Sequence, residues 1–231
     1  MKLQQQDPSW VPVFDNLREA IISHRLLPGT RLAEDELCNI YGLGRTVIRA
    51  ALSALTHEGL LTHIPNRGVH VAKPTKTEAR DVFEARSLVE PYIVKLASGL
   101  AQKNDIAELR THLAAEHRAI NTGNDSEAIA LSARFHINIA RIANHSILTG
   151  FVEELISRSS LIVSLYWRRH DTMCERHAHD ALVSAIESGD GQLAHDLMKS
   201  HLVDLLSGLD LIERPDQIIQ PLSETLGVQP C

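Results

Sequence analysis

Three histidines occupy positions from which their side chains could bind one metal ion together. His136, His179 and His201 each lie on the apolar face of a different predicted helix. Taken singly, a histidine on such a face is usually a core residue with a hydrogen-bond partner. Three neutral imidazoles that converge within one bundle instead form a site for a divalent ion such as zinc, nickel or manganese, because bundles build metal sites from facing helices. Both interpretations are open on these residues alone.

A second group of residues has the chemistry to read DNA. Arg45, Thr46 and Arg49 lie at the start of a predicted helix that follows the tight Gly-Leu-Gly turn at 42–44. Arginine can bind guanine O6 and N7 with two hydrogen bonds, and a threonine hydroxyl at a helix N-terminus suits a phosphate oxygen. A solvated helix face is the simpler explanation for two arginines at this spacing. The order of the neighbouring elements is what favours DNA contact.

The elements around these arginines predict a winged helix-turn-helix. Helical spacing of apolar residues, ended by glycine or proline, predicts helices at 12–27, 33–41 and 45–58. Strands are predicted at 60–64 and 69–71, joined by a turn of Pro-Asn-Arg-Gly composition. In such a domain the second helix of the pair enters the major groove of DNA. Arg67 and Gly68, at the tip of the hairpin, could then reach the minor groove or the phosphate backbone.

The remainder of the chain has only helical patterns. Beyond a short polar linker at 74–77, helices are predicted near 77–100, 103–121, 124–143, 146–169, 173–188 and 191–209. Thr75 and Glu78 have the spacing of a capping box at the start of the first of them. We therefore expect a mainly α protein: a winged helix-turn-helix at 1–73, an all-helical antiparallel bundle at 78–212 and a loosely attached tail at 213–231.

Composition is compatible with this organisation. The 231 residues suffice for two modest domains, and an aromatic content of 4% favours helices over a β-sandwich. A net charge of −6 repels phosphate at long range, yet residues 1–73 carry eight Lys/Arg and seven Asp/Glu, which permits a local basic face. Without a signal peptide or an apolar run that could cross a bilayer, we expect a cytoplasmic protein with no membrane partner. Scattered Cys38, Cys174 and Cys231 argue against a disulfide framework or a zinc-thiolate site.

The segment PGTRLAEDELCNIYGLGRTVIRAALSALTHEGLLTHIPNRGVHV resembles the DNA-binding domain of the GntR family of transcription regulators over its full width. The resemblance implies DNA contacts by Arg45, Thr46, Arg49 and the Arg67-Gly68 tip. The segment departs from the family pattern at Gly44, Val47 and Ala50, where Ser, Pro and Glu are usual. It also has Asp35 where some members carry a DNA-contacting arginine, so the resemblance assigns no DNA contact to that position.

The second half resembles the FCD ligand-binding domain of the FadR subfamily within the GntR family. The matching residues are Arg86-x-x-x-Glu90, Phe135-His136 in ARFHINIARIANHSIL, His179 in HDALVSAIESGD and His201 in AHDLMKSHL. This resemblance implies that the three histidines are metal ligands and that the bound metal helps to hold a small carboxylate effector.

Two positions in this half affect the expected site. Ser132 replaces the usual aspartate one helical turn before His136, and a hydroxyl is a poorer metal ligand than a carboxylate. We therefore expect weaker metal binding, or a coordination shell completed by water or effector. Arg86 either grips an effector carboxylate or pairs with Glu90 one turn on.

The function expected from both halves is sequence-specific DNA binding by a transcription regulator that responds to a small carboxylate. Repression is the commoner outcome in the family. A two-fold homodimer formed by the helical domains would place two recognition helices in successive major grooves. The alternative is a metal-dependent helical-bundle enzyme acting on a small metabolite. Such an enzyme needs a general base beside the metal, and sequence spacing places no acidic residue there.

Overall fold

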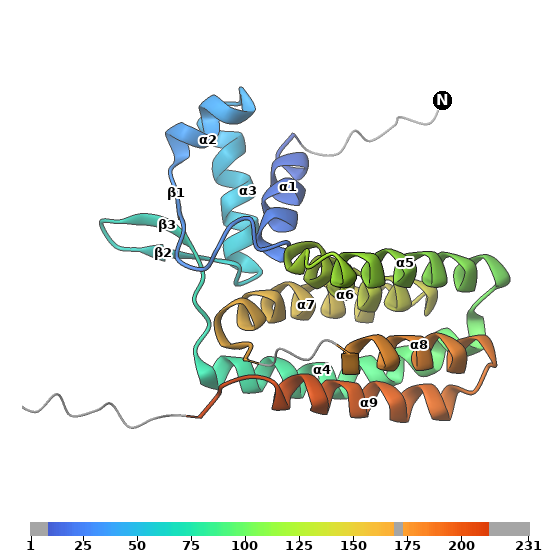
Figure 1. Cartoon of the computed structure of the whole chain (residues 1–231). Helices are drawn as coiled ribbons and strands as arrows, with labels where there is room; N and C mark the ends of the chain where they lie inside the picture. Colours follow the sequence, from blue (N-terminus) through green and yellow to red (C-terminus); the bar gives the residue numbers. More distant parts are fainter. Residues whose placement is uncertain (1–8, 169–172, 213–231) are drawn as a thin grey trace, which may run out of the picture.

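The computed structural model describes residues 9–168 and 173–212. Figure 1 shows a small domain of helices and strands standing on a larger bundle of helices. No helix in these ranges is long and apolar enough to cross a membrane. Of the three cysteines, only the side chain of Cys38 falls among the described ones, and it is a free thiol. The predicted tail at 213–231 lies outside the described residues.

The small domain has the predicted order of a winged helix-turn-helix. Its elements are α1 (Val11–Ile22), β1 (Arg31–Leu32), α2 (Glu34–Tyr41), α3 (Arg45–His57), β2 (Leu61–Ile64) and β3 (Gly68–Val71). Gly42 ends α2 in the left-handed conformation, with φ of 64°, which favours a residue without a side chain and allows the turn into α3 to be tight. Strands β2 and β3 form an antiparallel hairpin, as predicted.

The structure differs from the sequence pattern at two places in this domain. The helix predicted to reach residue 27 ends at Ile22, because His24 adopts a φ of 55° and turns the chain. Leu26 packs on the domain core from that turn, so its position imitates helical spacing. In addition, the two-residue strand β1 pairs with β3, giving a three-stranded sheet of order β1-β3-β2. Two residues are too few to show an alternating pattern.

The larger domain is an antiparallel bundle, as predicted. Its helices are α4 (Lys76–Leu100), α5 (Lys103–Asn121), α6 (Asp125–Ile142), α7 (Ser146–Tyr166), α8 (Met173–Glu187) and α9 (Gly191–Ser207). The predicted capping box is present: the Thr75 side chain accepts from the backbone of Glu78, and the Glu78 carboxylate accepts from the backbone of Thr75. Figure 1 shows α4 and α9 running side by side along one edge of the bundle.

The two domains meet where α1 packs against α6 and α7. Arg18 donates from Nε to Ser157 Oγ at 3.0 Å and from Nη2 to the Glu153 carbonyl at 2.8 Å. Leu161 of α7 is fully buried within the core of the small domain. These contacts join α1 to the middle of α7.

Candidate functional sites

The residues predicted to read DNA lie on the surface of the small domain. Arg45, Thr46 and Arg49 are exposed in the first turns of α3. Arg67 is exposed and Gly68 half-buried at the turn between β2 and β3. Gly68 has a φ of 86°, which favours glycine at this end of the hairpin. The structure thus presents these residues on the helix and hairpin that winged helix-turn-helix proteins use to bind DNA.

Arg45 and Arg49 of α3 each form an ion pair with an acidic residue of α2. Arg45 Nη2 lies 2.8 Å from Asp35 Oδ1. Arg49 Nε donates to Glu34 Oε2 at 2.8 Å. The sequence pattern did not predict these pairs, because they join side chains on two different helices.

The three predicted histidines converge in the interior of the bundle. His136 comes from α6, His179 from α8 and His201 from α9, and all three side chains are buried. A ring nitrogen from each lies within 4.8 Å of the others. His179 Nε2 and His201 Nε2 are 3.2 Å apart, close to the roughly 3.0–3.4 Å that separates two nitrogens bound to one ion at about 2.0–2.1 Å.

Two buried carboxylates accept hydrogen bonds from the Nδ1 atoms of His136 and His179. Glu90 Oε2 accepts from His136 Nδ1 at 2.5 Å, and Glu116 Oε2 accepts from His179 Nδ1 at 3.1 Å. Burial opposes ionisation of Glu90, but the Arg86 charge and the His136 bond lower the pKa of Glu90 to about 2. The carboxylate is therefore ionised and can only accept, which identifies His136 Nδ1 as the donor. The Nε2 lone pair of neutral His136 is then free to bind a cation.

The donor set fits a divalent metal. Metal-binding histidines commonly donate their second ring nitrogen to a carboxylate, which orients the ring and increases its basicity. Burial lowers the pKa of His136, and burial together with the neighbouring histidines lowers the pKa of His201 well below its ordinary value. Both rings are thus neutral near pH 7, the form in which imidazole binds metal. Among the described residues, these three histidines are the group of side chains whose ligand atoms lie close enough together to bind one metal ion.

Arg86 is held in a buried ion pair beside this cluster. Its Nε donates to Glu90 Oε1 at 2.5 Å, and its Nη1 donates to Ser159 Oγ at 3.1 Å. Its guanidinium carbon also lies 5.1 Å from the centre of the Phe83 ring. The structure therefore contains the Arg86–Glu90 pair that was one of the two expectations. These two bonds use only part of its five N–H donors, and Arg86 also lines the adjoining cavity.

A cavity of about 350 Å³ adjoins the histidine cluster. The polar residues that line it are Arg86, Glu116, Asp125, Ser132, His136, Ser159, Ser160 and Arg168. Its apolar lining includes Ile120, Ile129, Ile156, Val163, Trp167 and Leu205. A cavity of this size and composition suits a small molecule with one anionic end and an apolar body.

Glu116 is the main residue of this site that the sequence pattern did not single out. Its position in α5 continues the buried series of Leu109 and Leu113, and a carboxylate on such an apolar face is a signal that could have been recognised. Sequence spacing placed no acidic residue beside the histidines, whereas the structure brings Glu90 and Glu116 there. Each is bonded to a ring nitrogen, however, so both act as supports of the imidazoles.

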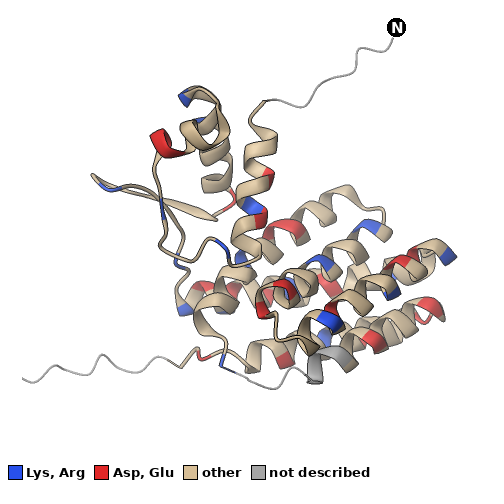
Figure 2. Ribbon diagram, turned by 45° about the horizontal axis from the view of Figure 1, so that its top comes forward, with Lys and Arg blue, Asp and Glu red and all other residues tan. Residues whose placement is uncertain are grey.

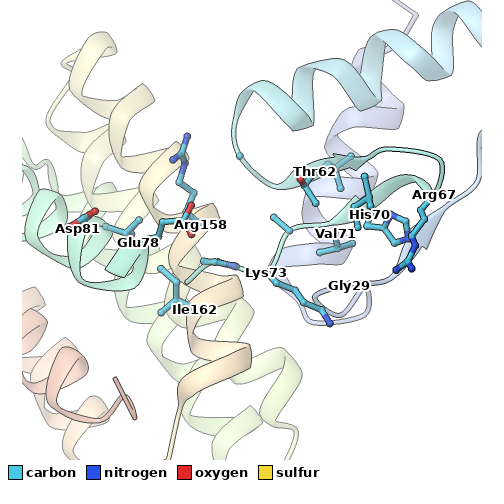
Figure 3. Close-up of a pocket in the computed structure, with 16 residues that line it drawn as sticks. Gly29, Thr62, Arg67, His70, Val71, Lys73, Glu78, Asp81, Arg158 and Ile162 are labelled. Atoms are coloured by element: carbon cyan, nitrogen blue, oxygen red, sulfur yellow. The ribbon is translucent and has the colours of Figure 1, made fainter. Parts of the chain in front are cut away.

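A second and larger cavity, of about 720 Å³, lies between the domains (Figure 3). The hairpin of β2 and β3, which is the wing of the small domain, contributes Thr62, Arg67 and His70 to one side. Helices α4 and α7 contribute Asp81 and Arg158 to the other. This opening separates the wing from the bundle. The small domain is therefore attached mainly through α1.

These features define a class of protein: a winged helix-turn-helix joined to a helical domain with an internal cavity. Residues 11–71 match the family of bacterial regulatory proteins called gntR, and residues 81–204, more than half of the chain, match the FCD domain. The chain belongs to the GntR family and carries a C-terminal FCD domain. It is therefore a DNA-binding transcription regulator.

Curated relatives agree with this assignment. The chain is 29% identical over 160 residues to the Nta operon transcriptional regulator of Aminobacter aminovorans, covering 68% of this chain and 75% of that protein. It is 27% identical over 198 residues to the HTH-type transcriptional repressor GlaR of Escherichia coli, covering 81% and 89% respectively. These relatives are regulators, and the enzyme alternative has no support among them.

Solved structures show the same fold. The structure of E. coli McbR/YncC superimposes with a TM-score of 0.78 at 21% identity, over 87% of this chain and 97% of that one. A GntR regulator from Rhodococcus sp. RHA1 gives a TM-score of 0.76 at 22% identity, over 89% and 99%. At these identities the likeness establishes the two-domain fold.

Proposed function

We propose that this regulator dissociates from its operator, or changes conformation on it, when a small carboxylate binds. The carboxylate would bind beside a divalent metal held by His136, His179 and His201, as in FadR-type members of the family. The observation that carries the proposal is the convergence of these three buried rings, with Glu90 and Glu116 bonded to two of them, next to a cavity that His136 lines. Zinc, nickel and manganese are the candidate ions, because all accept imidazole ligands.

Ser132 determines how the metal shell is completed. It lines the cavity with His136, one turn before it on α6, where a carboxylate would supply a fourth protein ligand. With serine there, an ion held by the three histidines would be neutralised less and would attract an anionic effector more strongly. Arg86, which also lines the cavity, is the proposed second contact for the effector carboxylate.

The route from the cavity to the DNA-binding domain runs through α7. Ser159 and Ser160 both line the cavity, and Ser159 also accepts from Arg86. Ser160 Oγ donates to the Ile22 carbonyl at 2.9 Å, and His24 Nε2 donates to the Ser160 carbonyl at 3.0 Å. A ligand that favours one position of α7 would therefore favour one position of the small domain.

On DNA, the proposed assembly is a homodimer formed by the FCD-like region at 78–212, with the domain at 1–73 of each copy on one half-site. Arg45, Thr46 and Arg49 would contact the major groove, and the Arg67-Gly68 tip the minor groove or backbone. We propose a repressor, like the E. coli transcriptional repressor GlaR to which the chain is similar, acting in the cytoplasm where its DNA target lies.

The experiment has two stages. The full-length protein first selects binding duplexes from a randomised pool, and fluorescence anisotropy then measures operator affinity with zinc and a panel of small mono-, di- and tricarboxylates. We expect a near-palindromic site and at least one acid that changes the dissociation constant about tenfold or more, which corresponds to about 1.4 kcal/mol. The change should disappear with a chelator and in His201→Gln, but persist in the control His195→Gln on the same helix. Operator binding that no carboxylate alters contradicts the proposal.

A further inference from the structure

The acidic first turn of α2 lies against the basic start of α3, the helix expected to read DNA (Figure 2). Asp35 pairs with Arg45 and Glu34 pairs with Arg49, each at 2.8 Å. The first pair is 73% and 65% exposed, respectively, so both partners lie at the surface that would meet DNA. A third carboxylate, Glu36, is exposed in the same turn, and the structure shows no ion pair for it among the described residues.

Stability does not account for this arrangement. Exposed ion pairs contribute little to folding, because water screens the charges and two long side chains lose freedom. The three acids do favour the N-terminus of α2 through the helix dipole. That effect needs no contact with an arginine, so it leaves the two specific pairs unexplained.

The pairs leave the arginines able to read bases. Arg49 is held through Nε, so all four hydrogens on its terminal nitrogens stay available, and Arg45 is held through only one terminal nitrogen. A guanidinium already fixed by a carboxylate also loses less freedom when it binds a guanine edge. Base contact and ion pairing are therefore compatible.

The pairs oppose contact with the DNA backbone. Attraction to non-operator DNA comes mainly from protein cations that replace the counterions of phosphate. Two carboxylates beside the two arginines cancel their charge at this surface, in a domain whose residues 1–73 carry only one more Lys/Arg than Asp/Glu. Hydrogen bonds to base edges depend on geometry and are affected less.

We propose that Asp35 and Glu34 are specificity-determining residues, which hold Arg45 and Arg49 toward base edges while suppressing their attraction to phosphates of non-operator DNA. The inference rests on the proposed role of the two arginines as base readers. Asp35, which stands where some relatives of the family have a DNA-contacting arginine, thereby acquires a function of its own.

The test compares Asp35→Asn, Glu34→Gln and their double variant with the control Glu36→Gln. The control removes the same charge from the same helix turn, including its effect on the helix dipole, but breaks no ion pair. Anisotropy of the full-length proteins measures affinity for a duplex selected by the wild type and for a scrambled duplex of equal composition, between about 50 and 200 mM salt. Circular dichroism confirms that each variant is folded.

We expect Asp35→Asn and Glu34→Gln, which each remove one charge as the control does, to bind the scrambled duplex about fivefold more tightly, with a steeper salt dependence, and Glu36→Gln about twofold or less. The ratio of scrambled to operator dissociation constants should fall at least fivefold in the double variant. A control that matches the two single variants, or an unchanged ratio in the double variant, overturns the inference alone. A wild-type protein that selects no sequence overturns the proposed readout and this inference with it.

Discussion

The hydroxyl of Ser160 donates a hydrogen bond of 2.9 Å to the carbonyl of Ile22, the last residue of α1. Carbonyls at the end of a helix lack a partner within it, and a side chain of the other domain supplies one here. Ser160 also lines the cavity beside the histidine cluster. One buried side chain thus contacts both the proposed effector site and the DNA-binding domain.

Replacing Ser160 with alanine should weaken the response to effector more than DNA binding itself. Ser160→Ala leaves a buried carbonyl unsatisfied, which lowers the free energy of unfolding by about 1–3 kcal/mol. Operator affinity without effector should change little, while the effector-induced change should fall severalfold. The control Ser157→Ala also loses a bond to α1, through Arg18, but at a residue outside the cavity wall. An equal loss of response in both variants would show that any contact between the domains suffices.

Glu116→Gln should weaken metal binding although Glu116 is proposed to support a ligand and not to bind the ion. Its bond to His179 Nδ1 orients the ring, and loss of such a carboxylate lowers metal affinity about 10–100-fold. Competition with a chromophoric chelator measures this affinity. Glu108→Gln, exposed on the same helix, is the control and should match the wild type. Wild-type affinity in Glu116→Gln would argue that His179 is not a ligand.

Ser132→Asp should strengthen metal binding by restoring a carboxylate ligand one turn before His136. The same change adds a negative charge to the cavity wall, so the effector carboxylate should bind more weakly to the metal-loaded protein. Calorimetric titrations with metal and then with effector measure the two affinities. Parallel changes in both, in either direction, would contradict the assigned position of Ser132.

The metal-free protein should lose stability as the pH falls below about 6.5. Burial lowers the pKa of His136 and, more strongly, of His201 in the folded state, whereas both titrate near 6.5 when unfolded. Below that pH the unfolded chain binds more protons, so the free energy of unfolding decreases by up to about 1.4 kcal/mol per pH unit for each histidine. Urea denaturation of chelator-treated protein between about pH 7.5 and 5 avoids most carboxylate titration. A constant free energy of unfolding across this range would mean that these rings are not buried as neutral groups.

Much of this molecule follows from its sequence because its helices are long and regularly patterned. The placement of His136, His179 and His201 on inward faces needs only helical periodicity. By contrast, the pairing of Arg45 with Asp35 depends on how two helices cross, and the strand at Arg31–Leu32 exists only through its pairing with β3. Periodicity describes one element at a time, so contacts between elements had to come from the structure.

The most direct test of this account is a zinc titration of chelator-stripped, full-length protein, followed by calorimetry and by metal analysis after gel filtration. The account predicts one retained ion per chain, and its loss in a variant with alanine at His136, His179 and His201 that circular dichroism shows to be folded. Nickel and manganese should compete for the same site. If the folded wild type retains none of the three metals, the histidines are core or direct effector-binding residues, and the proposed metal-held effector is contradicted.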